Sequence, residues 1–257
     1  MISKNLIRNV LLATAIMFSI PSHATVPVSG AEHLNTALQG FITRLEEAKK
    51  LKLLPRISNS KDAPVLEALW DVPAIIGTAP YRATDLPILM DIIQQQAQVT
   101  KTYVLFSPDA GKLPDTDRNS VAFQDEISRS SVAMLSFIAA ALEASEDFAQ
   151  ALTKDDTYKA RLAGVLKLRL GLQQVINGTA LMLRSPDLKP ENQQRLMLAL
   201  ADNAPAIAAA VSLQDRKTLI SVIEGAKPAL STTASTAADR FIKAMQNTDC
   251  TGLCALH

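Results

Sequence analysis

The longest stretch of regular hydrophobic spacing begins after Asp117 and reaches Leu152 without a proline or a glycine. The apolar residues that mark one side of it are Val121, Ile127, Val132, Leu135, Ile138 and Leu142. Residues at this spacing lie along one face of an α-helix. We therefore predict one long amphipathic helix, with Asp117 as its N-terminal cap.

A short polar turn at 154–157 separates this helix from a second long predicted helix, Tyr158–Arg184. Short connections between long helices favour antiparallel neighbours, so we predict a central helical hairpin. Folding the chain about the turn brings opposite charges together across the seam. The predicted ion pairs are Asp147–Arg161 and Asp125–Arg184.

Shorter amphipathic patterns predict further helices on both sides of the hairpin, and Asp85 is the predicted cap of the one at 86–106. Residues 54–87 are interrupted by five prolines, which permit only short helical pieces. The whole chain has only nine glycines, few for an all-β protein. The predicted fold is an all-α multi-helix bundle with a central long antiparallel hairpin and an irregular proline-punctuated segment.

The first 24 residues have the pattern of a secretory signal peptide. Lys4 and Arg8 precede the apolar run 10–20, and the small residues Ser22 and Ala24 occupy the positions that signal peptidase recognises. The apolar run is shorter than the about 20 residues that a membrane-spanning helix needs. We predict cleavage after Ala24, a single helical domain at 25–246, a C-terminal tail at 247–257 and no stable membrane insertion. The expected location is the periplasm or the extracellular space.

The charge of the predicted mature chain argues against nucleic-acid binding. Without Lys4 and Arg8, 24 basic and 25 acidic residues remain, a net charge of −1. Binding to a polyphosphate backbone requires clustered positive charge, usually with aromatic side chains that stack on bases. We therefore expect no nucleic-acid partner.

The two cysteines, Cys250 and Cys254, lie four residues apart in the tail. In an oxidising compartment this spacing predicts a small disulfide loop, worth about 2 kcal/mol by chain entropy. The alternative is a soft-metal site that adds His257, although structural sites normally use four protein ligands. The spacing differs from the C-x-x-C of thiol oxidoreductases.

Few residues are suited to catalysis. His33 and His257 are the only histidines after cleavage, and the sequence lacks G-x-S-x-G, H-E-x-x-H, Walker and G-x-G-x-x-G motifs. Paired carboxylates remain, at Asp115 and Asp117, at Asp155 and Asp156, and at Glu143, Glu146 and Asp147. We interpret the last group as a solvated acidic helix end facing the basic start of the next helix. No cofactor and no resident metal are expected.

Gly164, Gly171 and Gly178 recur at heptad spacing on the second long helix and so share one strip. Each costs about 1 kcal/mol relative to alanine in a helix interior. We favour close approach by another helix, through Ala133 and Ala140 or Ala139 and Ala144 of the preceding one. Apolar residues distributed round much of the glycine helix predict that it is central and covered on several sides. The alternative is a groove that admits an apolar ligand or a partner helix.

The proline-punctuated segment offers a second candidate binding surface, formed by Trp70, Asp71, Tyr81 and Arg82. Aromatic residues beside charges on irregular segments are typical of binding surfaces. We favour the simpler interpretation, in which Trp70 closes one end of the bundle and Arg82 is solvated.

These observations predict an exported helical binding or adaptor protein of the bacterial periplasm or extracellular space, with another protein or a small apolar ligand as its partner. No catalytic motif is evident. Two alternatives stay open: a hydrolase that depends on carboxylates or a metal, and a carrier of a small apolar ligand in a glycine-lined groove.

Overall fold

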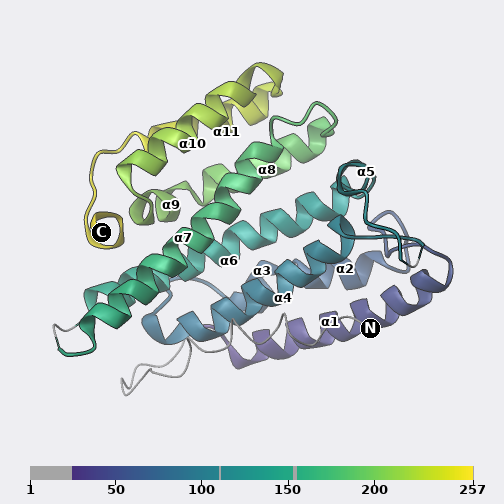
Figure 1. The fold of residues 1–257 in the computed structure, drawn as a ribbon, viewed down its shortest axis with the longest axis horizontal. Coiled ribbons are helices and arrows are strands. Elements are labelled where there is room, and N and C mark those ends of the chain that lie inside the picture. The colour runs from purple at the N-terminus through teal and green to yellow at the C-terminus, as the bar shows by residue number, and fades with distance from the viewer. Residues whose placement is uncertain (1–24, 110, 153–154, 257) are drawn as a thin grey trace.

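The computed structural model describes residues 25–109, 111–152 and 155–256, which form eleven α-helices and no strand (Figure 1). The fold is the predicted all-α multi-helix bundle. The α-helices are α1 (Val28–Lys50), α2 (Ala63–Leu69), α3 (Val72–Ile76), α4 (Leu86–Val104), α5 (Thr116–Ala122), α6 (Gln124–Gln150), α7 (Tyr158–Met182), α8 (Pro190–Asp202), α9 (Ala204–Ala210), α10 (Leu213–Ala226) and α11 (Thr232–Met245). The short 3₁₀ turns are η1 (Ala83–Asp85), η2 (Lys227–Ala229) and η3 (Gly252–Ala255).

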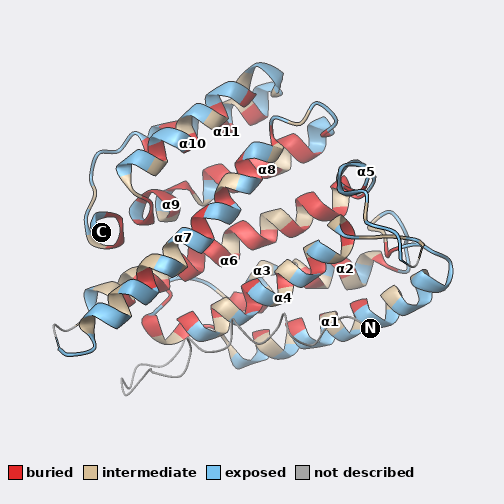
Figure 2. Ribbon diagram, in the orientation of Figure 1, coloured by how far each residue is buried: buried red, intermediate tan, exposed pale blue. Residues whose placement is uncertain are grey.

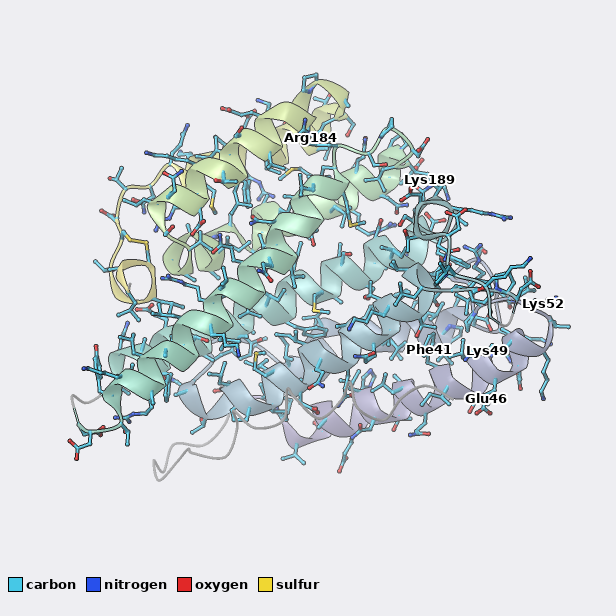
Figure 3. All side chains as sticks on the ribbon, viewed as in Figure 1. Phe41, Glu46, Lys49, Lys52, Arg184 and Lys189 are labelled. Atoms are coloured by element: carbon cyan, nitrogen blue, oxygen red, sulfur yellow. A yellow bond between two sulfur atoms is a disulfide. The ribbon has the colours of Figure 1, made fainter. Side chains whose placement is uncertain are left out.

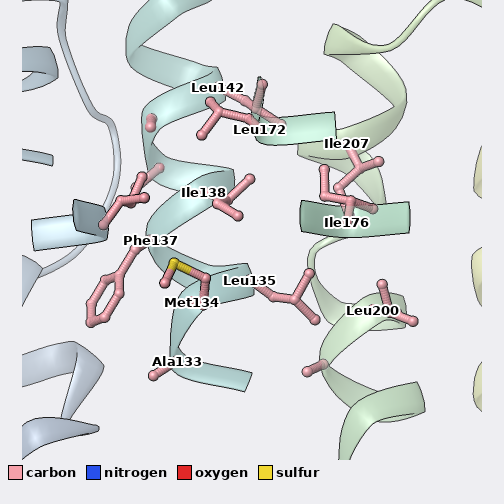
Figure 4. Close-up of a cluster of buried hydrophobic side chains, with 14 of the residues drawn as sticks. Ala133, Met134, Leu135, Phe137, Ile138, Leu142, Leu172, Ile176, Leu200 and Ile207 are labelled. Atoms are coloured by element: carbon pink, nitrogen blue, oxygen red, sulfur yellow. The ribbon is translucent and has the colours of Figure 1, made fainter. Parts of the chain in front are cut away.

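Helix α6 lies between the N-terminal helices α1–α4 and the C-terminal helices α8–α11 (Figure 1). It packs most extensively on α4 and α8. Leu135, Phe137 and Ile138 of α6 have no solvent exposure. Figure 4 shows Phe137 pointing to one side of α6 and Leu135 to the other, toward Leu200 of α8. Because α6 is apolar on opposite sides, both layers of the bundle are built on it.

By length and composition, α6 is the one helix among the described residues that could cross a membrane. However, 72% of its most apolar window is buried within the protein. A helix at the centre of a bundle has the same hydropathy as a membrane span, so the position of α6 accounts for its composition.

The prediction of one continuous helix after Asp117 is wrong, because the chain turns at Phe123 between α5 and α6. The Phe123 side chain is buried, with its ring centroid 5.5 Å from that of Tyr103 and 5.7 Å from that of Phe106. This aromatic packing accounts for the turn. The N-terminal cap of α5 is Asp115, whose carboxylate accepts the backbone N–H of Arg118, so the capping role predicted for Asp117 is also wrong.

The predicted central antiparallel hairpin of the two long helices is not confirmed. Both ion pairs predicted across its seam are wrong. Asp125 pairs with Lys189 at 2.7 Å, and Asp147 pairs with Arg82 rather than with Arg161. Figure 3 shows Arg184 well apart from Lys189, beside the C-terminal helices. The seam pairs fail because α4 and α8 are the main neighbours of α6, and α7 is not.

The sulfur atoms of Cys250 and Cys254 lie 2.03 Å apart, at disulfide distance. The loop they close is docked in the bundle, since Leu253 and Cys254 have no exposure. The buried Arg216 side chain donates hydrogen bonds to the carbonyl oxygens of Asn247 and Asp249, the latter at 3.0 Å.

The alternative metal site includes His257, which lies outside the described residues. Arg169 holds the tail by donating to the carbonyl oxygens of Leu253 at 2.6 Å and Leu256 at 3.0 Å.

If the tail is part of the core, Leu253→Ala lowers the free energy of unfolding by about 2–5 kcal/mol, because it leaves a cavity at a fully buried site. Leu113, which is 93% exposed, is the matched control, and Leu113→Ala changes stability by less than about 0.5 kcal/mol. Denaturant unfolding measures both. Equal effects of the two substitutions would contradict the burial of the tail.

Candidate functional site

Trp70 and Asp71 form the junction between α2 and α3. Trp70 ends α2, is half-buried and packs against the core, with its indole Nε1 buried. The Asp71 carboxylate accepts the backbone N–H of Ala74 at 3.2 Å and so caps α3. Both residues therefore have structural roles, and the interpretation of Trp70 as a packing residue fits its contacts.

Tyr81 and Arg82 lie against the C-terminal half of α6. Tyr81 is buried, and its hydroxyl donates to the carbonyl oxygen of Gly77 at 3.3 Å. Arg82 is exposed and pairs with Asp147 at 3.5 Å, so its guanidinium has a carboxylate partner rather than solvent alone. The predicted surface is thus divided between a helix junction and a loop anchored on α6.

Three carboxylates on α6 anchor two irregular segments of the chain. Glu143 accepts the backbone N–H of Tyr81 at 3.1 Å, and Asp147 accepts that of Ala83 at 2.8 Å. Glu146 accepts the backbone N–H of Leu253 at 2.5 Å. The interpretation of these residues as a solvated acidic end is therefore wrong.

The approach of Glu146 to the tail depends on Gly252. A Cβ atom at position 252 would lie 1.7 Å from Glu146 Oε1, and the residue has a positive φ of 58°. Glycine is the residue that tolerates both conditions. Any other residue at position 252 would strain the backbone and would require the Glu146 carboxylate to move.

These contacts bear on the hydrolase alternative. Glu143, Glu146 and Asp147 each direct a carboxylate oxygen at a loop amide, and the described residues contain no group of three side chains that could hold a metal ion. Asp155 is likewise engaged, accepting from Arg161 at 2.7 Å.

The carboxylates change the acidity of Tyr81. Burial, followed by the negative charges of Glu143 and Asp85, raises the pKa of the Tyr81 phenol from 10.0 to about 12. The phenol therefore stays protonated over the physiological range, where it can donate its hydrogen bond to Gly77.

His33 lies in a shallow groove between α1 and α2, a feature that sequence reasoning did not find. The groove has a volume of about 580 Å³ and includes Glu32, Gly40 and Val65 in its wall. His33 Nε2 lies 3.2 Å from the carbonyl oxygen of Ala68, a distance at which the protonated nitrogen donates. That bond joins α1 to α2 and gives His33 a structural role.

Gly164, Gly171 and Gly178 lie on an exposed strip of α7. A Cβ atom built on any of the three meets nothing within 4 Å in the described structure. Close approach by α6, through Ala133 and Ala140 or through Ala139 and Ala144, is therefore wrong as an explanation of the three glycines. Figure 2 shows exposed residues along the visible side of α7, whereas α6 is largely buried, so α7 is not covered on several sides.

Apolar side chains flank the glycine strip. Leu170 is 54% exposed, Leu181 is 51% exposed and Val175 is 39% exposed. At 100° per residue, Val175 lies on one side of the strip and the two leucines lie on the other. We call this surface the α7 face; its members are Gly164, Lys167, Leu170, Gly171, Gln174, Val175, Gly178 and Leu181.

Charge on α7 has one sign. The helix carries Lys159, Arg161, Lys167 and Arg169 and has neither Asp nor Glu. The absence of acidic residues was available from the sequence, and together with the heptad glycines it distinguishes α7 from the other long helices.

Comparisons with protein-family models, with curated proteins and with solved structures found no match for this chain.

Removing the charge of Glu143 tests the environment of Tyr81. Because the folded-state pKa of about 12 exceeds the ordinary 10.0, the associated stability is present below about pH 10 and is lost as the pH rises to about 12. Glu143→Gln lowers the Tyr81 pKa to between these values, since burial still acts on the phenol. Phenolate absorbance, with Tyr81→Phe subtracted, measures the shift.

Glu146→Gln is the matched control for this titration. It removes a charge from the same helix, at a position that contacts Leu253 rather than Tyr81. It leaves the Tyr81 pKa at about 12. An unchanged Tyr81 titration in Glu143→Gln would contradict the assigned contact.

Proposed function

We propose that this chain is an exported binding protein and that its α7 face receives a helix of another protein. The observation that carries the proposal is the exposed strip of Gly164, Gly171 and Gly178, which meets nothing else in the described structure. The same surface has exposed apolar side chains that an interface could bury: Leu170, Val175 and Leu181.

Glycine in the interior of a helix is destabilising. Three interior glycines destabilise α7 by about 3 kcal/mol relative to alanine. Alanine would fit at each position, because its Cβ would meet open space. A helix from a partner gains from glycine, since interaxial distance depends on the side chains at the contact. Contacts with a partner helix would therefore offset the cost of the three glycines, which no contact in the described fold offsets.

The charge of α7 specifies the partner further. Lys167 lies within the exposed strip, and α7 has no acidic residue. A second copy of the chain would place cationic helices against each other, which is unfavourable. The partner we propose is a different protein, with a helix that presents small apolar residues and a carboxylate able to pair with Lys167.

Export would place the binding event outside the cytoplasm. It is supported by the signal-peptide pattern of residues 1–24 and by a cysteine pair at disulfide distance, since disulfides persist in oxidising compartments. The location that follows is the periplasm or the extracellular space.

The two other candidate functions have less support. A carboxylate hydrolase would need acidic groups free for chemistry, whereas Glu143, Glu146 and Asp147 accept loop amides. A carrier of a small apolar ligand would need the three glycines to line an enclosed groove, whereas they lie on an exposed helix face.

The central test is the triple variant Gly164→Ala, Gly171→Ala, Gly178→Ala. We expect it to raise the free energy of unfolding by about 1–3 kcal/mol and to weaken partner binding at the same time. Unfolding is measured with denaturant. Binding is measured in intact cells with a photo-crosslinking residue at Gln174, which should link the chain to a different polypeptide in the wild type and not in the variant.

Two controls separate this result from general effects. Gly225→Ala changes another helical glycine, on α10, and should leave the crosslink unchanged. A crosslinker at exposed Gln214 of α10 should not capture the same polypeptide. A crosslink between two copies, or one that survives the triple substitution, would contradict the proposal.

A further inference from the structure

Asp85 carries a fully buried carboxylate whose described partners are three backbone N–H groups. Its Oδ2 accepts from Arg82 at 2.7 Å. Its Oδ1 accepts from Thr25 at 2.5 Å and from Val26 at 2.9 Å. The side chain was predicted to cap α4, but it makes no capping hydrogen bond there and instead holds the segment that enters α1.

Other buried carboxylates in the described structure have cationic partners. Asp62 pairs with Arg44 at 2.7 Å, and Glu126 pairs with Arg56 at 3.2 Å. Among the described ion pairs Asp85 has no such partner, although its residue exposure is 0%. Backbone N–H groups compensate part of the cost of burying this carboxylate, and a nearby cation would stabilise it further.

The shortest of the three hydrogen bonds comes from the Thr25 nitrogen, which belongs to the peptide bond predicted to be cleaved. Hydrolysis of Ala24–Thr25 breaks the bond between the Ala24 carbonyl carbon and the Thr25 nitrogen. Water adds its oxygen to the Ala24 carbonyl carbon, which becomes a carboxylate, and both water protons go to the Thr25 nitrogen. An α-amino group has a pKa of about 8, so at neutral pH Thr25 then carries an ammonium group.

We propose that Asp85 is the counter-ion of the Thr25 α-ammonium, a buried ion pair that exists only after the leader is removed. The pair rests on the cleavage site of the proposed export and is independent of the α7 face. Removal of the signal peptide thus creates a positive charge on Thr25, next to the negative charge of Asp85. The added charge strengthens the Thr25–Asp85 contact, which anchors the mature N-terminus.

The contact ties three parts of the chain together. Val26 is buried, and Gly30 of α1 lies so close to α3 that a Cβ there would be 1.9 Å from the carbonyl oxygen of Ile75. Asp85 ends η1, whose first residue, Ala83, is held by Asp147 of α6. A stronger bond between Thr25 and Asp85 therefore fixes the start of α1 relative to α6.

A double-mutant cycle on the exported full-length precursor tests the pair. One change inserts Ala-Ser after Ala24, which displaces the new amine by two residues, and the other is Asp85→Asn. We expect the insertion to raise the unfolding equilibrium constant at least about tenfold with Asp85 present, about 1.4 kcal/mol, and less than about threefold with Asn at position 85. Equal effects in both backgrounds overturn the proposal.

Asp62→Asn is the matched control, because Asp62 is a buried carboxylate with its own cation; there the insertion should retain its full effect. The intact mass of the purified chain identifies its first residue. A native start other than Thr25 overturns the pair while leaving the binding proposal for α7 unaffected.

A second measurement uses only chains that retain Asp85, in case Asp85→Asn does not fold. An amine-reactive acyl ester should label the displaced amine at least about tenfold faster than the Thr25 amine, because an ammonium paired in a buried site is protected. Mass spectrometry of the N-terminal peptide gives both rates. Equal rates overturn the proposal.

Discussion

Backbone amides outside the helices need hydrogen-bond acceptors wherever they are shielded from water, and carboxylates of the helices provide them here. Glu143 and Asp147 of α6 hold the segment that leads into α4, and Glu146 holds the tail. Glu126, at the other end of α6, accepts the backbone N–H of Ile57 at 2.9 Å and so fixes the connection between α1 and α2. Three irregular segments of the protein are thus anchored on one helix.

Some parts of the surface make contacts that hold the fold together, whereas the exposed side of α7 does not. The acidic groups of α6 and the residues from Trp70 to Arg82 are occupied by caps, loop amides and ion pairs. The exposed side of α7 combines glycines, apolar side chains and a lysine with no comparable contact described. The proposal of a binding protein rests on this contrast.

The sequence was sufficient for the fold class and for most helices, because helical periodicity and capping residues act locally. Helix α7, Tyr158–Met182, agrees with the helix predicted at Tyr158–Arg184. The turn at Phe123 could not be foreseen, since it depends on Tyr103 and Phe106, which are distant in sequence. The heptad glycines were found, but whether a neighbour covers them depends on how α7 packs.

The most direct test of the anchoring role of α6 is the hydrogen exchange of the loop amides of Ala83 and Leu253. We predict exchange as slow as that of the α4 amides, although neither residue lies in an α-helix. Asp147→Asn should accelerate exchange at Ala83 alone, and Glu146→Gln should accelerate it at Leu253 alone. Fast exchange of both amides in the wild type, or no change in either variant, would contradict the account.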